Sequence, residues 1–429
     1  MLLLTFCFIL ASTNALPHNL LPEIPGLELI NKLLTISANN VTSNVSLNVD
    51  ETLTTLELVK KYGYNGELHK VITFDGYVLE LHRITGKANS SDLHIQKPVA
   101  FVMHGLLCNS AVWVLPGPEK GLAFILADAG YDVWLGNARG TTYSRKHTDL
   151  SVLDKEYWDF SWHEIGTRDL PATIDYILKT TRREKLFYLG HSEGTTSFFV
   201  MASERFEYQD KIEAMFAMAP AAYCGRAKSP VLRFLATFSN SIDIFMKLLG
   251  KYEIQPIHEG YKIFQELVCE ENAITEPLCS NFLFLIAGFD SDQYNKTLLP
   301  IILEYVPAGA ATKQLLHYTQ LAHSGQVVSA GQFRQFDYGL IGNLKKYGSV
   351  SPPAYDLKKI QVPVSLHYSS NDWLANVKDV DKLYKELGNP YGKFRVPHDK
   401  FNHLDFMWAI DVKDLLYDKI LSLMTHFPH

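Results

Sequence analysis

Residues 186–196 of the 429-residue chain contain the residue types needed for nucleophilic catalysis. An apolar run over residues 186–189 leads to Ser192, which stands between Gly190 and Gly194. A Gly-x-Ser-x-Gly sequence places its serine on a sharp turn between a strand and a helix, where glycines let the two backbones pass without a side-chain collision. Free N–H groups at the start of that helix favour negative charge on a bound carbonyl oxygen. The pattern indicates acyl transfer, unless the two glycines flank the serine by chance.

Acyl transfer also needs backbone donors for an oxyanion. The apolar run 99–103 predicts a buried strand that leads directly into His104-Gly105-Leu106. In an α/β hydrolase, the loop after this strand supplies one N–H group and the residue after the nucleophile supplies the other. We therefore expect Leu106 and Glu193 to be the donors; the alternative is an ordinary turn between a strand and a helix. His104 is expected to be structural, because no second histidine, cysteine or carboxylate stands at metal-ligand spacing.

The acid and the base follow later strands. Asp372 comes just after the predicted strand 362–368, and a carboxylate at that position can hold an imidazole in one tautomer. The predicted strand 393–396 leads towards His403. The resulting chain order, Ser192, Asp372, His403, is that of the α/β hydrolases.

Three other residues are candidates for these two positions. His398 lies closer to the last strand than His403 does, and Asp379 and Asp405 are the other acids. Neither acid directly follows a strand end, so we retain Asp372 and His403. In this arrangement the histidine accepts the serine proton and the aspartate stabilises the imidazolium, so the reaction requires no metal or organic cofactor.

The surrounding pattern predicts an α/β fold. Two β-rich runs around Asp75-Gly76, residues 71–74 and 77–84, predict an antiparallel hairpin. Predicted helices and strands then alternate, which implies a mostly parallel sheet flanked by helices. The expected helices cover residues 121–129, 169–179 and 413–426, and further strands cover 131–135 and 212–220.

The alternation is interrupted between residues 226 and 345, where helical apolar segments are expected at 231–238, 242–249, 282–289 and 301–306. An insertion at the carboxyl end of a strand lies over the ligand-binding edge of the sheet, so we interpret it as a mainly helical cap with an apolar pocket. The alternative is an independent helical domain. The aromatic residues at 157–162 are expected to pack around a long loop rather than to form a binding platform.

The N-terminal sequence predicts that the protein is exported. Residues 2–11 form an uncharged apolar run and small residues follow up to Ala15, so residues 1–15 are expected to be a signal peptide. A membrane anchor is the alternative, but a span needs roughly 20 apolar residues. Residues 16–57 are expected to form an arm or propeptide, followed by the first part of the core (58–225), the cap (226–345) and the second part of the core (346–429).

Composition narrows the choice of partners. The chain has 47% hydrophobic and 20% charged residues and a net charge of −6, with no basic run. It is therefore expected to be globular and not to bind nucleic acid, and no later stretch is long enough to span a membrane.

Possible glycosylation and disulfide sites are consistent with a protein of an oxidising compartment. Glycosylation sequons start at Asn40, Asn44, Asn89 and Asn295. Cys269 and Cys279 bracket a polar loop that a disulfide could close. Cys108 and Cys224 could pair, but we favour buried free thiols, because lone cysteines are commonly buried.

With these motifs assembled, the chain resembles the acid lipases, the α/β hydrolases that include the gastric and lysosomal lipases. The resemblance covers residues 62–427 and rests on motifs at residues 104–107, 137–140, 158–166, 190–194, 307–309 and 401–406. It implies a secreted or lysosomal glycoprotein that hydrolyses triacylglycerols or sterol esters at a lipid–water interface. It also implies the roles of Ser192, Asp372 and His403, and a cap disulfide between Cys269 and Cys279.

One residue departs from the family pattern, in which glutamine usually follows the nucleophile. Here the residue is Glu193, and a carboxylate beside the oxyanion would oppose it unless it is turned away or protonated. We expect its side chain to point out of the site. The competing functions are a carboxylesterase for shorter soluble esters and a non-catalytic lipid carrier.

Overall fold

The computed structural model describes residues 52–88, 96–237, 250–256, 283–324 and 331–428. The chain divides into two units, Met1–Thr52 and Leu53–His429, and the elements below belong to the second. The predicted signal peptide and the predicted sites at Asn40, Asn44, Asn89, Cys269 and Cys279 lie outside the described residues, as does the helical segment expected at 242–249.

The second unit begins with a helix and a hairpin. Helix α3 (Thr55–Lys61) starts inside the segment assigned to the arm, and a capping box between Thr54 and Glu57 holds its first turn. Strands β1 (Tyr64–Ile72) and β2 (Tyr77–Lys87) pair antiparallel. The hairpin predicted around Asp75-Gly76 is confirmed.

The described strands form one main sheet in the order β1-β2-β4-β3-β6-β7-β10-β11, and the short strand β5 (Lys146–His147) pairs with β2. Every pairing from β4 to β11 is parallel, which confirms the predicted mostly parallel sheet. These strands are β3 (Val99–Met103), β4 (Asp132–Leu135), β6 (Leu186–His191), β7 (Ile212–Met218), β10 (Val364–Tyr368) and β11 (Pro390–Arg395).

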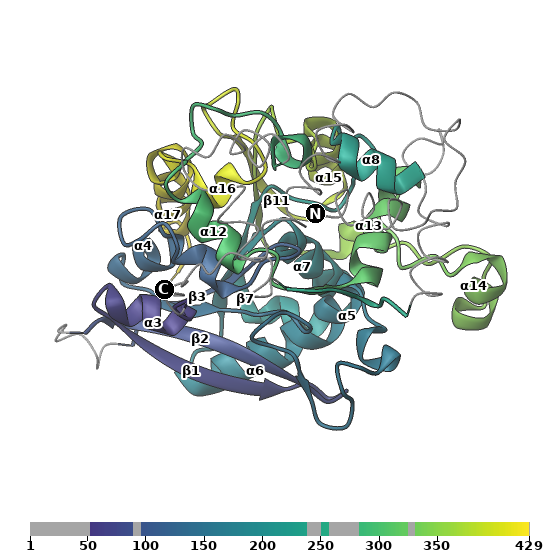
Figure 1. The fold of residues 1–429 in the computed structure, drawn as a ribbon, viewed down its shortest axis with the longest axis horizontal. Coiled ribbons are helices and arrows are strands. Elements are labelled where there is room, and N and C mark those ends of the chain that lie inside the picture. The colour runs from purple at the N-terminus through teal and green to yellow at the C-terminus, as the bar shows by residue number, and fades with distance from the viewer. Residues whose placement is uncertain (1–51, 89–95, 238–249, 257–282, 325–330, 429) are drawn as a thin grey trace, which may run out of the picture. The chain divides into compact units, whose positions relative to one another are not determined.

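Helices cover both faces of this sheet (Figure 1). Alternate side chains of a buried strand enter opposite cores: Phe101 of β3 belongs to one apolar cluster and Val102 to the other. The first cluster contains α6 (Leu170–Thr181), α7 (Glu193–Glu204) and α15 (Val377–Glu386). The second contains α4 (Leu122–Asp128), α16 (Asp405–Trp408) and α17 (Asp418–Met424).

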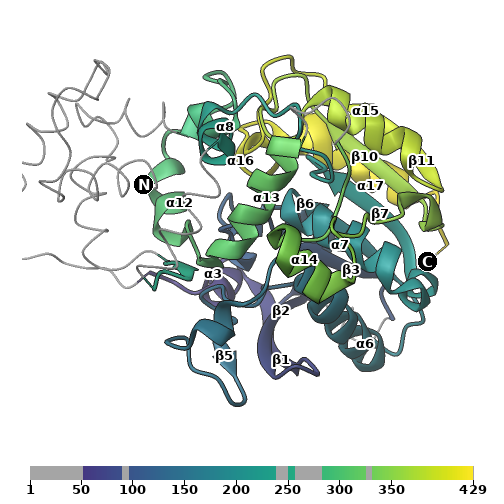
Figure 2. The ribbon, with the colours of Figure 1, turned by 90° about the vertical axis from the view of Figure 1, so that its right-hand side faces the viewer.

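The predicted insertion contains several helices among its described residues. They are α8 (Pro230–Thr237), α12 (Leu299–Tyr305), α13 (Thr312–Ser324) and α14 (Gly339–Tyr347), the last of which runs past the boundary expected at residue 345. Strands β8 (Glu253–Ile254) and β9 (Ala310–Ala311) form a separate two-stranded sheet. Helices α8 and α13 lie side by side (Figures 1 and 2).

Short helical segments complete the described elements: α5 (Trp162–Glu164) and the segments Ser110–Trp113, Lys155–Trp158, Ile165–Asp169, Phe206–Lys211, Leu357–Lys359 and Lys413–Tyr417. The predicted packing role of the aromatic residues is confirmed, because Tyr157, Trp158, Phe160 and Trp162 are all buried. Asn295 is partly exposed in the turn before α12, where its side-chain oxygen accepts a hydrogen bond from the Leu298 N–H group. In the described ranges, no helix has the length and apolar character needed to cross a membrane.

Candidate active site

Ser192 occupies a strained turn between β6 and α7. Its backbone has φ +52° and ψ −115°, a conformation that residues with a side chain rarely adopt. No residue with a side chain would fit at the two flanking glycines, because its Cβ atom would collide with the backbone. A Cβ atom on Gly194 would lie 2.5 Å from the Met103 carbonyl oxygen, and one on Gly190 would lie 2.9 Å from the Gly194 carbonyl carbon. The sequence therefore forms the expected strand, turn and helix, and the serine side chain stays partly exposed.

A chain of hydrogen bonds joins Ser192, His403 and Asp372. The distance from Ser192 Oγ to His403 Nε2 is 2.8 Å, and that from His403 Nδ1 to Asp372 Oδ2 is also 2.8 Å. The other aspartate oxygen accepts the N–H groups of Leu374 and Ala375, each at 2.8 Å. An ionised Asp372 can only accept, so Nδ1 donates to it and Nε2 is left to accept the serine proton.

The rival residues lie outside this chain of hydrogen bonds. His398 Nε2 lies 2.9 Å from an oxygen of Asp290, and Asp379 forms an ion pair with Arg226. Asp405 accepts the Asn402 N–H group, and burial, together with the nearby Asp290, raises the pKa of its carboxyl well above the usual range. The structure therefore brings together the three residues expected from the sequence and not their rivals.

One backbone segment holds the loops that carry the acid and the base. The Ala287 carbonyl oxygen accepts hydrogen bonds from the N–H groups of Trp373 and His403, at 3.1 and 3.3 Å. The Asn371 side-chain amide donates to the carbonyl oxygens of Phe289 and Lys400. The segment 287–289 therefore fixes the spacing between Asp372 and His403.

The loop after β3 lies against Ser192. A Cβ atom on Gly105 would be only 3.0 Å from the Ser192 Cβ atom. His104 fixes this loop, because its Nδ1 donates to the Gly105 carbonyl oxygen and its Nε2 accepts the Ala138 N–H group. Burial lowers the pKa of His104 to about 4, which fits the expected structural role. No hydrogen bond to another described residue engages the N–H groups of Leu106 and Glu193, so both can bind an oxyanion.

Comparisons with known proteins show which chains resemble this one. The family model of the partial alpha/beta-hydrolase lipase region matches residues 55–117, and the model of the alpha/beta hydrolase fold matches residues 99–251. The chain is 42% identical to Lipase 1 of Drosophila melanogaster over 380 residues, which cover 88% of this chain and 81% of that protein. It is 37% identical to gastric triacylglycerol lipase of Bos taurus over 383 residues, which cover 89% and 93% of the two chains.

The chain belongs to the acid lipase family of α/β hydrolases. It is a carboxylic ester hydrolase. The fold is also that of a solved soluble variant of monoglyceride lipase from Saccharomyces cerevisiae, with a TM-score of 0.51 at 12% sequence identity over 90% of this chain and 100% of that one.

Glu193, which stands where the family usually has glutamine, makes a buried contact with the insertion. Its side chain is buried and directed at α13, where its Oε1 accepts a hydrogen bond of 2.7 Å from the Gln314 side-chain amide. Burial raises the pKa of Glu193 to about 8, so the group is a neutral acid at pH 7. A neutral carboxyl does not oppose negative charge on a nearby oxyanion.

Sequence reasoning missed the structural role of Arg139 in this acid lipase. The guanidinium is fully buried, donates to Asp75 and Asp169, and lies 3.9 Å from the centre of the Tyr77 ring. It thereby joins the hairpin turn, the loop after β4 and the start of α6. A signal was present in the sequence, because an arginine in an otherwise uncharged stretch between Leu135 and Tyr143 needs a buried acid.

The two other cysteines follow the prediction. Cys108 and Cys224 are free and buried, and burial raises the pKa of the Cys108 thiol to about 12. Neither thiol is therefore a nucleophile at neutral pH.

An open hollow also exists at the opposite end of the strands, lined in part by Phe206, Ile212, Val362 and Phe427. It lies at the amino ends of β7 and β10, whereas Ser192 and Asp372 follow carboxyl ends, so it is not part of the ester site.

Proposed function

We propose that this acid lipase is a secreted or lysosomal serine lipase that hydrolyses neutral lipid esters, triacylglycerols or sterol esters. The hydrogen-bonded chain from Ser192 through His403 to Asp372 is the observation that carries the proposal. The similarity to gastric triacylglycerol lipases supports the substrate class. The apolar run at residues 2–11 and the four sequons support export.

In the proposed mechanism, Ser192 Oγ attacks the ester carbonyl carbon while His403 Nε2 accepts its proton. The negative oxygen of the tetrahedral intermediate accepts hydrogen bonds from the N–H groups of Leu106 and Glu193, and Asp372 stabilises the imidazolium. The intermediate then collapses, the bond to the alcohol oxygen breaks, and His403 returns the proton to that oxygen. Water, activated by the same histidine, repeats the sequence on the acyl-enzyme and releases the fatty acid.

Helix α13 packs against the start of α7, the helix that follows Ser192. Its Gln314 binds Glu193, and the Tyr318 hydroxyl lies 2.8 Å from Thr196 Oγ1 in the first turns of α7. Both contacts are buried, so this part of the insertion shields the first turns of α7 from water.

The nucleophile is tested by comparing two serine variants. Ser192→Ala should lower hydrolysis of emulsified trioleoylglycerol and of p-nitrophenyl butyrate by at least about 10⁴-fold, because only the attacking oxygen is lost. Ser197→Ala is the matched control, because it removes a hydroxyl that is buried in the same helix and has no hydrogen-bond partner among the described residues. It should keep both activities.

Substantial hydrolysis by Ser192→Ala would mean that another residue is the nucleophile. A wild-type enzyme that hydrolyses the butyrate ester but not trioleoylglycerol would be a carboxylesterase for short esters, and the lipase proposal would be wrong.

A further inference from the structure

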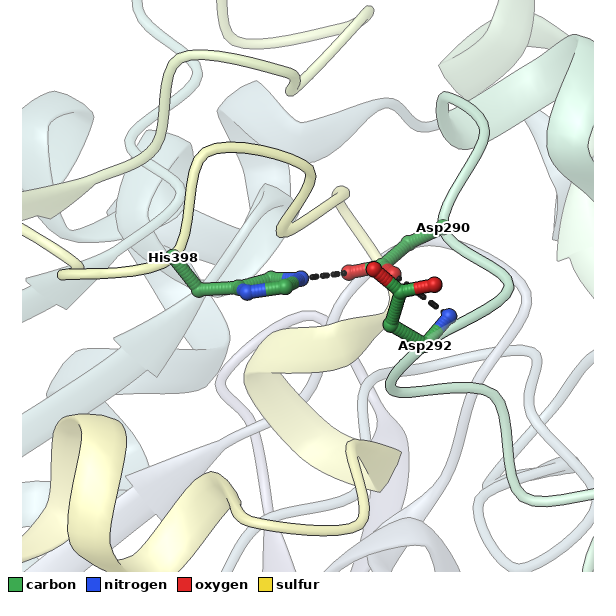
Figure 3. A group of neighbouring side chains, drawn as sticks. All are labelled: Asp290, Asp292 and His398. Carbon is green, nitrogen blue, oxygen red and sulfur yellow. Dashed lines mark hydrogen bonds and ion pairs between the residues drawn. The ribbon is translucent and has the colours of Figure 1, made fainter.

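A second cluster of chemically active side chains lies beside the histidine loop. Asp290, Asp292 and His398 each place one nitrogen or oxygen atom within 4.8 Å of the other two (Figure 3). The two aspartates belong to the segment that follows Ala287, and His398 belongs to the loop between β11 and α16. None of the three takes part in the hydrogen-bonded chain at Ser192.

The buried member of this cluster directs one carboxylate oxygen at the histidine. Asp290 is fully buried, and its Oδ1 accepts the N–H groups of Asp292 and Gln293. Its Oδ2 lies 2.9 Å from His398 Nε2, and the contact is an ion pair when the imidazole is protonated. Both atoms are buried, and the contact lacks the geometry of a hydrogen bond. With a neutral imidazole, two electron-pair donors would face each other in the interior, which is costly unless a cation lies between them.

The surroundings contain a third carboxyl group. Asp405, also buried, forms a side-chain hydrogen bond with Asp290, and burial holds the pKa of the Asp405 carboxyl well above its usual range. The amine of Lys400 donates a hydrogen bond of 3.0 Å to the exposed carboxylate of Asp292. The interior of the cluster thus contains acids and a histidine, and its lysine is on the outside.

We propose that Asp290, Asp292 and His398 form a binding site for a divalent ion of the zinc type. Zinc binds imidazole nitrogens and carboxylate oxygens, and in sites with three protein ligands water takes the fourth position. Calcium is a poorer match, because it prefers six to eight oxygen ligands. On binding, Asp292 exchanges its contact with Lys400 for the ion.

The proposed ion stabilises the fold and takes no part in ester hydrolysis. It joins the segment that contains Ala287, which binds the loops of both Asp372 and His403, to the loop that carries His403. Metal bound only by the folded chain raises its stability. The inference does not depend on the role of Ser192, and its test measures binding rather than turnover.

The test is a titration of the full-length protein with ZnCl₂, after treatment with a chelator and dialysis, followed by calorimetry and by thermal unfolding. We expect one zinc ion per chain and a rise in Tm, both absent in His398→Ala. Asp292→Asn should bind zinc at least about tenfold more weakly, because even the loss of groups that only orient metal ligands costs 10- to 100-fold. Asp399→Asn is the matched control, because it makes the same change at an exposed neighbour that pairs with Arg395. It should bind zinc like the wild type.

Absence of zinc binding would overturn the proposal. It would also be wrong if His398→Ala and Asp292→Asn bound zinc with the same isotherm and the same rise in Tm as the wild type. If His398→Ala lowers Tm only at acidic pH and zinc has no effect on the wild type, His398 and Asp290 form an ion pair and not a metal site. Because Asp292 is exposed, its variant should fold even where the histidine variant does not.

Discussion

Burial decides the charge of Glu193, the residue next to the proposed nucleophile. Desolvation disfavours the carboxylate and raises its pKa to about 8, although the hydrogen bond from Gln314 works in the opposite direction. The other titratable groups that interact with it are Cys108 and Tyr318, and neither carries a positive charge. The side chain therefore behaves much like the glutamine that is usual in the family, but only while it remains protonated.

Replacing Glu193 with glutamine should change the pH dependence of catalysis. The wild-type kcat/KM should fall as pH rises through about 8, because the ionised carboxylate then opposes the oxyanion. Glu193→Gln should keep its rate over that range, and Glu119→Gln, an exposed control, should follow the wild type. Rates on a soluble ester between pH 6 and 10 test this, and identical profiles for Glu193→Gln and the wild type would contradict it.

The same variant should change how stability depends on pH. In the folded state Glu193 keeps its proton up to about pH 8, whereas the unfolded carboxyl releases it near its usual pKa of 4.5. The folded state thus binds more protons between these values, and the wild type loses stability as pH rises through that window. The Tm of Glu193→Gln minus the Tm of the wild type should therefore increase from pH 5 to pH 8.

At the residue scale, the sequence predicted the side chains that strand ends position. Ser192 and Asp372 each follow a buried strand, so the fold class itself brings them to one edge of the sheet. The contacts of Glu193 and Asp290 could not be predicted in this way. Their partners, Gln314 and His398, are more than 100 residues distant along the chain, and no periodic pattern connects them.

At the element scale, Arg139 connects the loop after β4 to the hairpin turn and to the start of α6. Its partners are Asp75 in the hairpin turn and Asp169 at the start of α6, and Asp169 is as deeply buried as the arginine itself. Removing the arginine would leave that carboxylate without a counter-charge in the interior.

Arg139→Met should therefore lower the free energy of unfolding by about 3–5 kcal/mol, as expected when one partner of a buried ion pair is removed. Urea titration measures this loss. Lys413→Met, which removes an exposed pair with Asp418, should cost less than about 1 kcal/mol. Adding Asp169→Asn to Arg139→Met should recover part of the loss. Equal effects of the two single variants would contradict the role given to Arg139.

Strands were predicted better than the helices of the insertion, for a physical reason. Strands β3, β6 and β7 are almost entirely buried and consist mostly of apolar residues. Helix α13 was missed because the side chains that it buries are partly polar, namely Gln314, His317 and Thr319. Buried polar residues interrupt the helical spacing of apolar residues by which a helix is identified from sequence. Strand β5 was missed because two residues carry no pattern.

At the scale of the whole molecule, α14 presents apolar side chains to water. Leu340, Ile341 and Leu344 are 64%, 80% and 47% exposed, and Lys345 and Lys346 follow in the last turn. An amphipathic surface of this kind suits a lipid–water interface, where apolar side chains enter the lipid and lysines remain at its surface.

The double variant Leu340→Glu/Ile341→Glu should hydrolyse emulsified trioleoylglycerol at least about tenfold more slowly, because burying each such side chain contributes about 1.5–3 kcal/mol. Hydrolysis of dissolved p-nitrophenyl butyrate should not change. Leu153→Glu is the control, because Leu153 is 91% exposed in a loop far along the chain from α14. Unaltered emulsion activity in the double variant, or an equal loss in the control, would remove α14 from the lipid-facing surface.

The backbone of Ser192 has a consequence for laboratory evolution. A glycine would occupy that torsion at ease, whereas serine is held there only by its surroundings. A library selected for heat resistance alone should therefore enrich clones that have lost the hydroxyl and can no longer turn over ester. Engineering a hardier form of this hydrolase has to screen turnover and melting temperature together.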